Sequence, residues 1–149
     1  MPNPQRLDSA PGYVAIRLGQ TRLLVDALEV RDIRGAEQAE PDHASPAVLR
    51  RGGREVPIVA PAASLRALAP RTNAQIVVLH DAGGELALAC DEIAVLPAGR
   101  VSVEALRPCM QAGESPVVAL ARVGGEPAFL CRGRALAACA RRLSEPQDG

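Results

Sequence analysis

The stretch YVAIRLGQTRLLVDALEVRDIRG, residues 13–35, decides the fold, because a second version of it stands later in the same chain. Each version alternates apolar with polar or small residues, turns at a glycine, returns as a second strand-like run, and reaches an aspartate expected to cap the next turn. Such a recurring unit predicts two packed copies of one β element. The matching positions lie 65 residues apart: Gly19 and Gly84, Leu23 and Leu88, Asp26 and Asp91, Leu28 and Ile93, Val30 and Val95.

The pattern predicts many short strands and few helices. Each copy is followed by a further hairpin with paired glycines and then by an alanine-rich segment. Short helices are expected at 62–68 and 134–143, and 97–116 is expected to be an irregular connection with a helical turn near 103–106. The expected strands are 13–18, 22–25, 28–33, 48–49, 56–60, 75–80, 86–90, 91–96, 117–122 and 128–131.

Strands at this spacing predict a mainly β protein. We expect two pseudo-symmetric small five-stranded antiparallel β-barrel subdomains with short helices, one of them C-terminal. Residues 1–12 are expected to be a disordered lead and 144–149 a frayed tail. The domain between them, 13–143, is expected to consist of two intertwined halves, 13–70 and 75–143. The cleft between the barrels is the natural place for a partner to dock.

Composition excludes several kinds of partner. The 149 residues carry a formal net charge of zero, and Tyr13 and Phe129 are the only aromatic residues. Nucleic-acid binding is therefore not expected, since it needs basic surface and, for single strands, aromatic stacking platforms. No charged-then-apolar leader begins the chain and no apolar run has membrane-spanning length. Direct membrane insertion is therefore not expected, and the protein is interpreted as cytoplasmic.

Catalytic, cofactor and metal sites are not expected. The four cysteines form no C-x-x-C pair and have no histidines at zinc spacing, so they are interpreted as reduced and structural. His80 beside Asp81 is the one pairing that hints at base chemistry, but neighbours on a strand point to opposite faces. A small hydrolytic or small-molecule-binding barrel that uses these two residues is the alternative from another functional class.

Four segments of the chain follow the order of motifs in a known family. Within the opening stretch, VRDI at 30–33 matches a run close to V-x-E-I. VLRRGGREVPIV at 48–59 matches a strand, an arginine-glycine turn and a V-P-[VI]-[IV] run, with Gly52 in the usual arginine position and Arg51 one place before it. IVVLHDAGGELALACDEIAVL at 76–96 and the last glycine hairpin with its helix complete the set. Together they resemble the CheW-like family of bacterial chemosensory coupling proteins, of which this chain looks like a diverged member.

The resemblance implies a non-catalytic scaffold in two-component signal transduction. CheW-like proteins couple the cytoplasmic tips of methyl-accepting chemoreceptors to the regulatory domain of a CheA-type histidine kinase. The same adaptor role is expected here, in chemotaxis, pilus motility or another alternative array. A diverged member that binds only the kinase domain, as a competitor or localisation factor, is the alternative within the fold. Carried over by position, the partner-binding residues are Val30, Asp32, Ile33, Arg51 and Val56.

Overall fold

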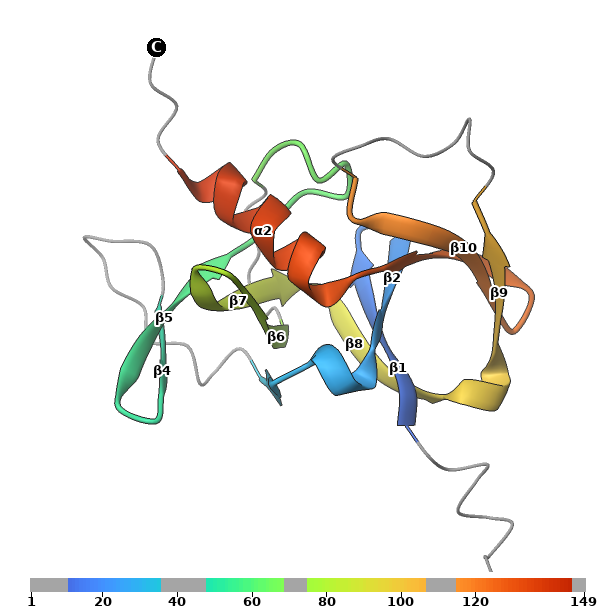
Figure 1. The fold of residues 1–149 in the computed structure, drawn as a ribbon, viewed down its shortest axis with the longest axis horizontal. Coiled ribbons are helices and arrows are strands. Elements are labelled where there is room, and N and C mark those ends of the chain that lie inside the picture. Colours follow the sequence, from blue (N-terminus) through green and yellow to red (C-terminus); the bar gives the residue numbers. More distant parts are fainter. Residues whose placement is uncertain (1–10, 36–47, 69–74, 107–114, 146–149) are drawn as a thin grey trace, which may run out of the picture.

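The computed structural model describes residues 11–35, 48–68, 75–106 and 115–145, which form two β-sheets and the helix α2 (Gly133–Ser144) (Figure 1). The 3-10 turns are η1 (Ala27–Glu29) and η3 (Ala98–Arg100). The strands are β1 (Pro11–Leu18), β2 (Thr21–Asp26), β3 (Asp32–Arg34), β4 (Val48–Arg51), β5 (Arg54–Val59), β6 (Gln75–Asp81), β7 (Gly84–Cys90), β8 (Glu92–Pro97), β9 (Val101–Ala105), β10 (Val117–Val123) and β11 (Glu126–Cys131).

The two sheets exchange strands between the sequence repeats. The first sheet has the order β8-β1-β2-β11-β10-β9, and the second has the order β3-β6-β7-β5-β4. The hairpins β1–β2 and β6–β7 stay within their own copy, but β3 pairs with β6 and β8 pairs with β1. In the same way β5 joins β7 and β11 joins β2. The repeat therefore appears in space as two intertwined, pseudo-symmetric sheets, in which β9 has no counterpart among the described residues.

The glycines and aspartates that recur in the sequence repeat lie at or near the hairpin turns. Gly19 lies in the first hairpin turn and Gly84 directly follows the second, and their positive φ angles of 62° and 113° are a conformation that glycine adopts without steric cost. Asp26 accepts the Leu28 N–H at 2.9 Å and so caps the turn after its own hairpin, as predicted. Asp91 instead accepts the Gly19 N–H at 2.6 Å, so it fastens the turn of the other copy.

The predicted fold class is confirmed: the protein is mainly β, with two pseudo-symmetric sheets and a C-terminal helix. Two details differ from the prediction of five antiparallel strands in each unit. The first sheet has a sixth strand, and each sheet contains one parallel pair, because β5 and β11 each pair with the second strand of the other copy's hairpin. None of the described helices is both long enough and apolar enough to cross a membrane.

Three local predictions were wrong. The expected strand 28–33 begins as η1 and becomes a strand only at β3. The segment 62–68 lies between prolines and is too short for a stable helix, so it forms a bend closed by a backbone hydrogen bond of 2.8 Å. No helical turn forms at residues 103–106. Residues 103–105 belong to β9 instead, because the β-branched residues of β9 pair with β10.

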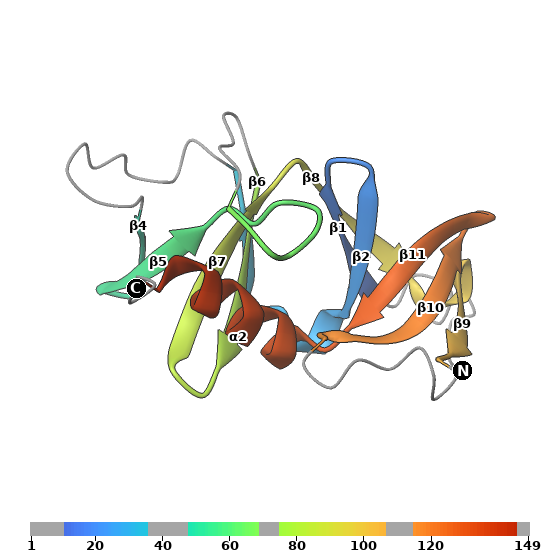
Figure 2. The ribbon, with the colours of Figure 1, turned by 90° about the horizontal axis from the view of Figure 1, so that it is seen from above.

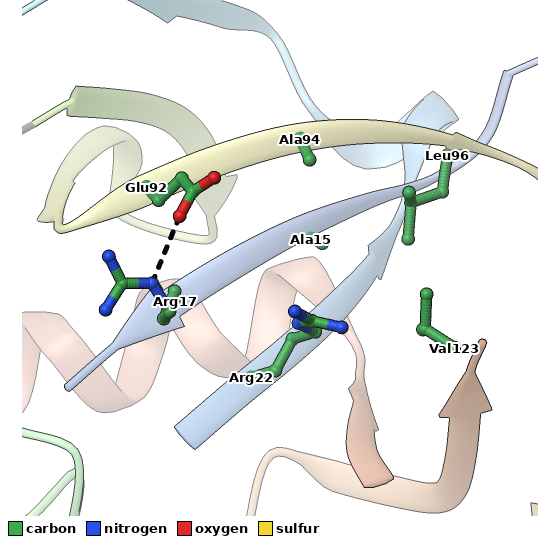
Figure 3. Close-up of a pocket in the computed structure, with 7 residues that line it drawn as sticks. All are labelled: Ala15, Arg17, Arg22, Glu92, Ala94, Leu96 and Val123. Atoms are coloured by element: carbon green, nitrogen blue, oxygen red, sulfur yellow. Dashed lines mark hydrogen bonds and ion pairs between the residues drawn. The ribbon is translucent and has the colours of Figure 1, made fainter. Parts of the chain in front are cut away.

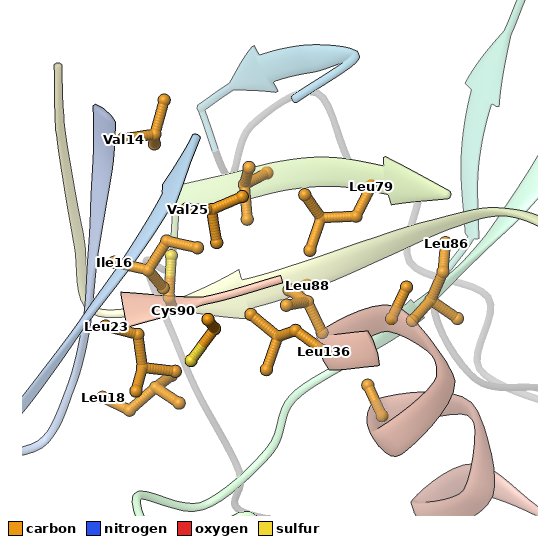
Figure 4. Close-up of a cluster of buried hydrophobic side chains, with 14 of the residues drawn as sticks. Val14, Ile16, Leu18, Leu23, Val25, Leu79, Leu86, Leu88, Cys90 and Leu136 are labelled. Atoms are coloured by element: carbon orange, nitrogen blue, oxygen red, sulfur yellow. The ribbon is translucent and has the colours of Figure 1, made fainter. Parts of the chain in front are cut away.

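The core lies mainly between the two sheets. In Figure 4 side chains from β1 and β2 meet side chains from β6, β7 and α2 in one cluster. Figure 2 shows α2 running beside the second sheet, where it packs on β5, β6 and β7. The docking cleft expected between the barrels is therefore filled at its centre and limited to its exposed rim. Smaller clusters fill the second sheet (Leu49, Val56, Ile76, Val78 and Ala87) and the first (Ala15, Leu24, Ala121 and Ala128).

Candidate functional site

The turn η1 presents an apolar side chain at the rim of the core. Leu28 is 92% exposed, the largest exposed fraction among the large apolar side chains of the described residues. Its position follows from local hydrogen bonds: Asp26 caps the turn, and the Val30 N–H donates to the Ala27 carbonyl at 3.3 Å. These bonds replace a strand by a 3-10 turn, and Leu28 points into solvent instead of lying along a sheet.

Glu29 fastens this turn to the start of helix α2. Its Oε2 accepts the Gly133 N–H at 2.9 Å, at a helix N-terminus where Arg132 provides no side-chain cap. A Cβ at Gly133 would lie 3.0 Å from the Glu29 Cβ, so the absence of a side chain allows this close approach. The result is a cleft of about 310 Å³, hereafter the Leu28 cleft, lined by Leu28, Glu29, Arg31, His80 and Arg134.

A second group of side chains lies between the two edge strands of the second sheet, β3 and β4. Asp32 on β3 accepts a hydrogen bond from Arg34 Nε at 2.8 Å, and Arg51 Nε on β4 lies 3.6 Å from the same carboxylate oxygen. Arg51 Nη1 donates to both carboxylate oxygens of Glu85 on β7, at 2.9 and 2.7 Å. Arg51 Nη2 also donates to the Arg31 carbonyl at 3.2 Å. The four side chains, Asp32, Arg34, Arg51 and Glu85, are called the Arg51 network.

The Arg51 network closes the second sheet through side chains. β3 and β4 stand at opposite ends of the sheet order, yet Arg51 reaches β3, and Arg34 Nη1 reaches the Arg50 carbonyl at 3.1 Å. Burial by itself raises the pKa of Asp32. The hydrogen bonds from Arg34 and the Ile33 N–H, together with the nearby arginine charges, outweigh burial and hold that pKa below its usual range. Asp32 is therefore ionised at neutral pH, and the network links the two edge strands of the second sheet, β3 and β4, through side chains.

The residues carried over by position fall into three settings. Asp32 and Arg51 are brought together in the network. Val30 is half-buried against the core between the sheets, and Val56 is buried inside the second sheet. Ile33, which is 39% exposed, is therefore the most open apolar member of the set, and it lies just beyond η1. The structure does not gather all five residues into one patch.

Sequence reasoning missed Glu85 and Leu28. Glu85 lies 34 positions from Arg51, and no spacing rule links residues on strands that meet only through the exchange. In the expected strand 28–33, the alternation of side chains would put Leu28 on one face together with Val30. The available signal was Asp26, because an aspartate that accepts the N–H two residues on is typical of a capped turn.

A small hollow lies at one end of the first sheet (Figure 3). Its volume is about 100 Å³, and four of its lining residues are the small or branched Ala15, Ala94, Leu96 and Val123. Two ion pairs stand at or near its mouth, Arg17 with Glu92 at 3.2 Å and Arg22 with Glu126 at 3.4 Å. These pairs are open to solvent and contribute little stability. The hollow exists because the paired strand positions Ala15 and Ala94 carry small side chains, and it has room for a few water molecules.

The residues of the catalytic alternative are held apart. Asp81 is buried and accepts two hydrogen bonds from Arg141, at 3.0 and 2.9 Å, whereas His80 is exposed at the Leu28 cleft. The Arg141 hydrogen bonds lower the pKa of Asp81, burial opposes them, and the Gly83 N–H adds to the lowering. Asp81 is therefore committed to Arg141. Within the described residues, no group of histidine, cysteine, aspartate and glutamate is arranged to hold a metal ion.

The described cysteines behave as buried apolar residues. Cys90, Cys131 and Cys139 are buried thiols that form no disulfide within the described residues, while Cys109 lies outside those residues. Burial, with a smaller contribution from the neighbouring Cys139, raises the pKa of Cys131 to about 12. A thiol held in its protonated form at neutral pH is a poor nucleophile, which fits the predicted structural role.

Two strand-exchanged sheets with a C-terminal helix define a CheW-like fold. Among solved structures, the chain is similar to the crystal structure of the scaffolding protein TtCheW from Thermoanaerobacter tengcongensis. The TM-score is 0.62 at 14% sequence identity, and the match covers 85% of this chain and 92% of that chain. No family model and no curated protein sequence matches the chain. The likeness at this identity establishes the fold, and the fold expected from the sequence resemblance is confirmed.

Proposed function

We propose that this protein is a CheW-like adaptor that acts by binding and not by catalysis. Its partners would be the cytoplasmic tip of a methyl-accepting chemoreceptor and the regulatory domain of a CheA-type histidine kinase. In that role it would be cytoplasmic and recruited to membrane-associated receptor arrays. The observation that carries the proposal is the fold likeness to a scaffolding protein over 85% of this chain and 92% of that one.

The rim at η1 and β3 is the surface that supports this role best. Leu28 and Ile33 are exposed apolar side chains on one short segment, and the neighbouring Arg31 and Arg134 are exposed as well. Apolar anchors beside arginines are typical of protein interfaces. A receptor helix with an apolar stripe and flanking acidic residues would bury the anchors and pair with the arginines.

The experiment is direct binding of the full chain to a receptor tip fragment and, separately, to a kinase regulatory domain, measured by calorimetry. Binding to both supports the coupling role. Binding to the kinase domain alone supports the competitor or localisation role instead. Binding to neither contradicts the proposal.

A pair of leucine substitutions locates the surface. Leu28→Glu places a charge at the proposed contact and should weaken receptor binding by about 100-fold, because an unpaired charge in an apolar contact costs several kcal/mol. Leu68→Glu is the matched control, since Leu68 is also an exposed leucine but lies outside η1 and β3. Equal affinities for both variants would remove η1 from the interface.

The hydrolytic or small-molecule alternative has a separate test. His80→Ala removes the one described imidazole without touching the Asp81–Arg141 pair. If the protein is an adaptor, neither the parent chain nor this variant turns over a small molecule. Turnover of a small molecule by the parent chain that disappears in His80→Ala would overturn the adaptor proposal.

A further inference from the structure

We propose that β9 pairs antiparallel with β9 of a second copy of this chain, which forms a two-fold dimer. The inference stands apart from the adaptor role. Among the described strands, β9 pairs on one side with β10 and ends the first sheet. The second sheet has no described counterpart of this strand, so β9 is an addition to the repeated architecture. An edge strand offers unpaired N–H and C=O groups to another strand.

The exposure of β9 shows that its free side is open. Ser102, Val103, Glu104 and Ala105 are all exposed. Val103 faces Ala121 across the β9–β10 ladder, and the two side chains point to the same side of the sheet. Ala121 is 4% exposed, but Val103 is 44% exposed. An apolar residue on the inner side of a barrel is therefore left uncovered at the edge, where a further strand would cover it.

Little in β9 protects it against pairing. Its register with β10 is continuous, with no bulge, and it contains no proline and no basic residue. Glu104 is its one charge. Edges that avoid other strands usually carry prolines, bulges or several charges.

The sequence of β9 is complementary to itself in the antiparallel register centred on Val103. In that register Val103 faces Val103 of the second copy, and Ser102 faces Glu104 of the second copy. Arg122 on β10 already stands opposite Ser102. Arg122 and Glu104 of the second copy would then lie in one row, two strands or about 10 Å apart at the backbone. The small Ser102 side chain between them lets the two long side chains meet.

Charge pairing favours a second copy over an unrelated strand. Among the described residues, neither Arg122 nor Glu104 has an ion-pair partner. A two-fold axis forms the Arg122–Glu104 pair twice, so both charges of both chains are matched. Each chain has one β9, so the interaction closes at two copies and does not extend into a fibre.

The test is a charge-reversal cycle measured by light scattering and analytical ultracentrifugation over a wide concentration range. The parent chain is expected to dimerise in a concentration-dependent manner. Glu104→Arg and Arg122→Glu each create two like-charge contacts and should weaken the dimer by about 10-fold or more. The double variant restores opposite charges and should recover the parent dissociation constant. Glu55→Arg, which reverses an exposed glutamate on β5, is the control and should leave dimerisation unchanged.

Circular dichroism melts of every variant keep the outcome interpretable, because all three substituted side chains are exposed and each fold should survive. A parent chain that stays monomeric up to several hundred micromolar overturns the proposal and leaves β9 available to a strand of another protein. A dimer that tolerates both single reversals, or that the double variant fails to restore, equally overturns the β9 register.

Discussion

The two sheets share one repeat but differ in how their interiors are filled and how their ends are closed. Inside the second sheet, the large side chains of Leu49 and Ile76 are buried, and the Arg51 network ties its two edge strands together. In the first sheet, the small side chains of Ala15 and Ala94 leave a hollow of about 100 Å³, and its edge strands β8 and β9 are linked through η3. The repeat determines strand order, whereas packing and closure depend on side chains that differ between the copies.

The hairpins differ in the same way at one equivalent position. Leu18 in the first hairpin and Asp81 in the second are each the last strand residue before the turn, where they face Thr21 and Gly84. Leu18 is buried in the core between the sheets, while Asp81 binds Arg141 near the end of α2. The second hairpin therefore anchors the helix through an ion pair.

Removing the Asp81–Arg141 pair should have the largest effect. Arg141→Ala leaves a buried carboxylate without its partner, and we expect a loss of about 2 kcal/mol in unfolding free energy, reduced from the fully buried case because Arg141 is partly exposed. Urea unfolding monitored by circular dichroism measures it. Arg142→Ala, an exposed neighbour on the same helix, is the control and should change stability by less than about 0.5 kcal/mol.

The loss of unfolding free energy in Arg141→Ala should depend on pH in a defined direction. The pKa of Asp81 is lowered in the folded state, so its stabilising contribution is complete above the ordinary carboxyl pKa and is lost as the pH falls through the lower, folded value. The stability gap between the parent chain and Arg141→Ala should therefore be full at pH 7 and shrink below about pH 4. A gap that stays constant to acid pH would show that Arg141 acts through packing alone.

The strand repeat could be predicted from the sequence because it depends on local patterns. Glycine turns, alternating runs and the C-terminal helix are all visible within a few residues of one another. The exchange of β3 and β8 between the copies is a non-local outcome, and either hairpin could have kept its own third strand. Arg51 with Glu85, and Asp81 with Arg141, depend on that exchange and on tertiary contact, so their pairing could not be predicted from spacing.

An identical substitution in each sheet tests the difference in packing. Ala87 is fully buried in the filled second sheet, so Ala87→Val should overpack it and lower the unfolding free energy by about 1.5 kcal/mol. Ala15 lines the hollow of the first sheet, so Ala15→Val has space for its methyl groups and should change stability by less than about 1 kcal/mol in either direction. Thermal and urea unfolding of the two variants, compared side by side, decide it. Equal losses would mean that the hollow does not accept a side chain.

The closure of the second sheet should have the smallest effect on stability and a larger local effect. Arg51→Gln removes the contacts to Glu85 and Asp32, all of which are partly exposed, and should cost about 1 kcal/mol. Because β3 is three residues long, its amides should lose hydrogen-exchange protection before the rest of the sheet does. Arg54→Gln, which faces Arg51 across the hairpin but is exposed, is the control. If β3 keeps its protection in Arg51→Gln, its ladder with β6 suffices, and the two sheets then differ in packing but not in how their edges are held.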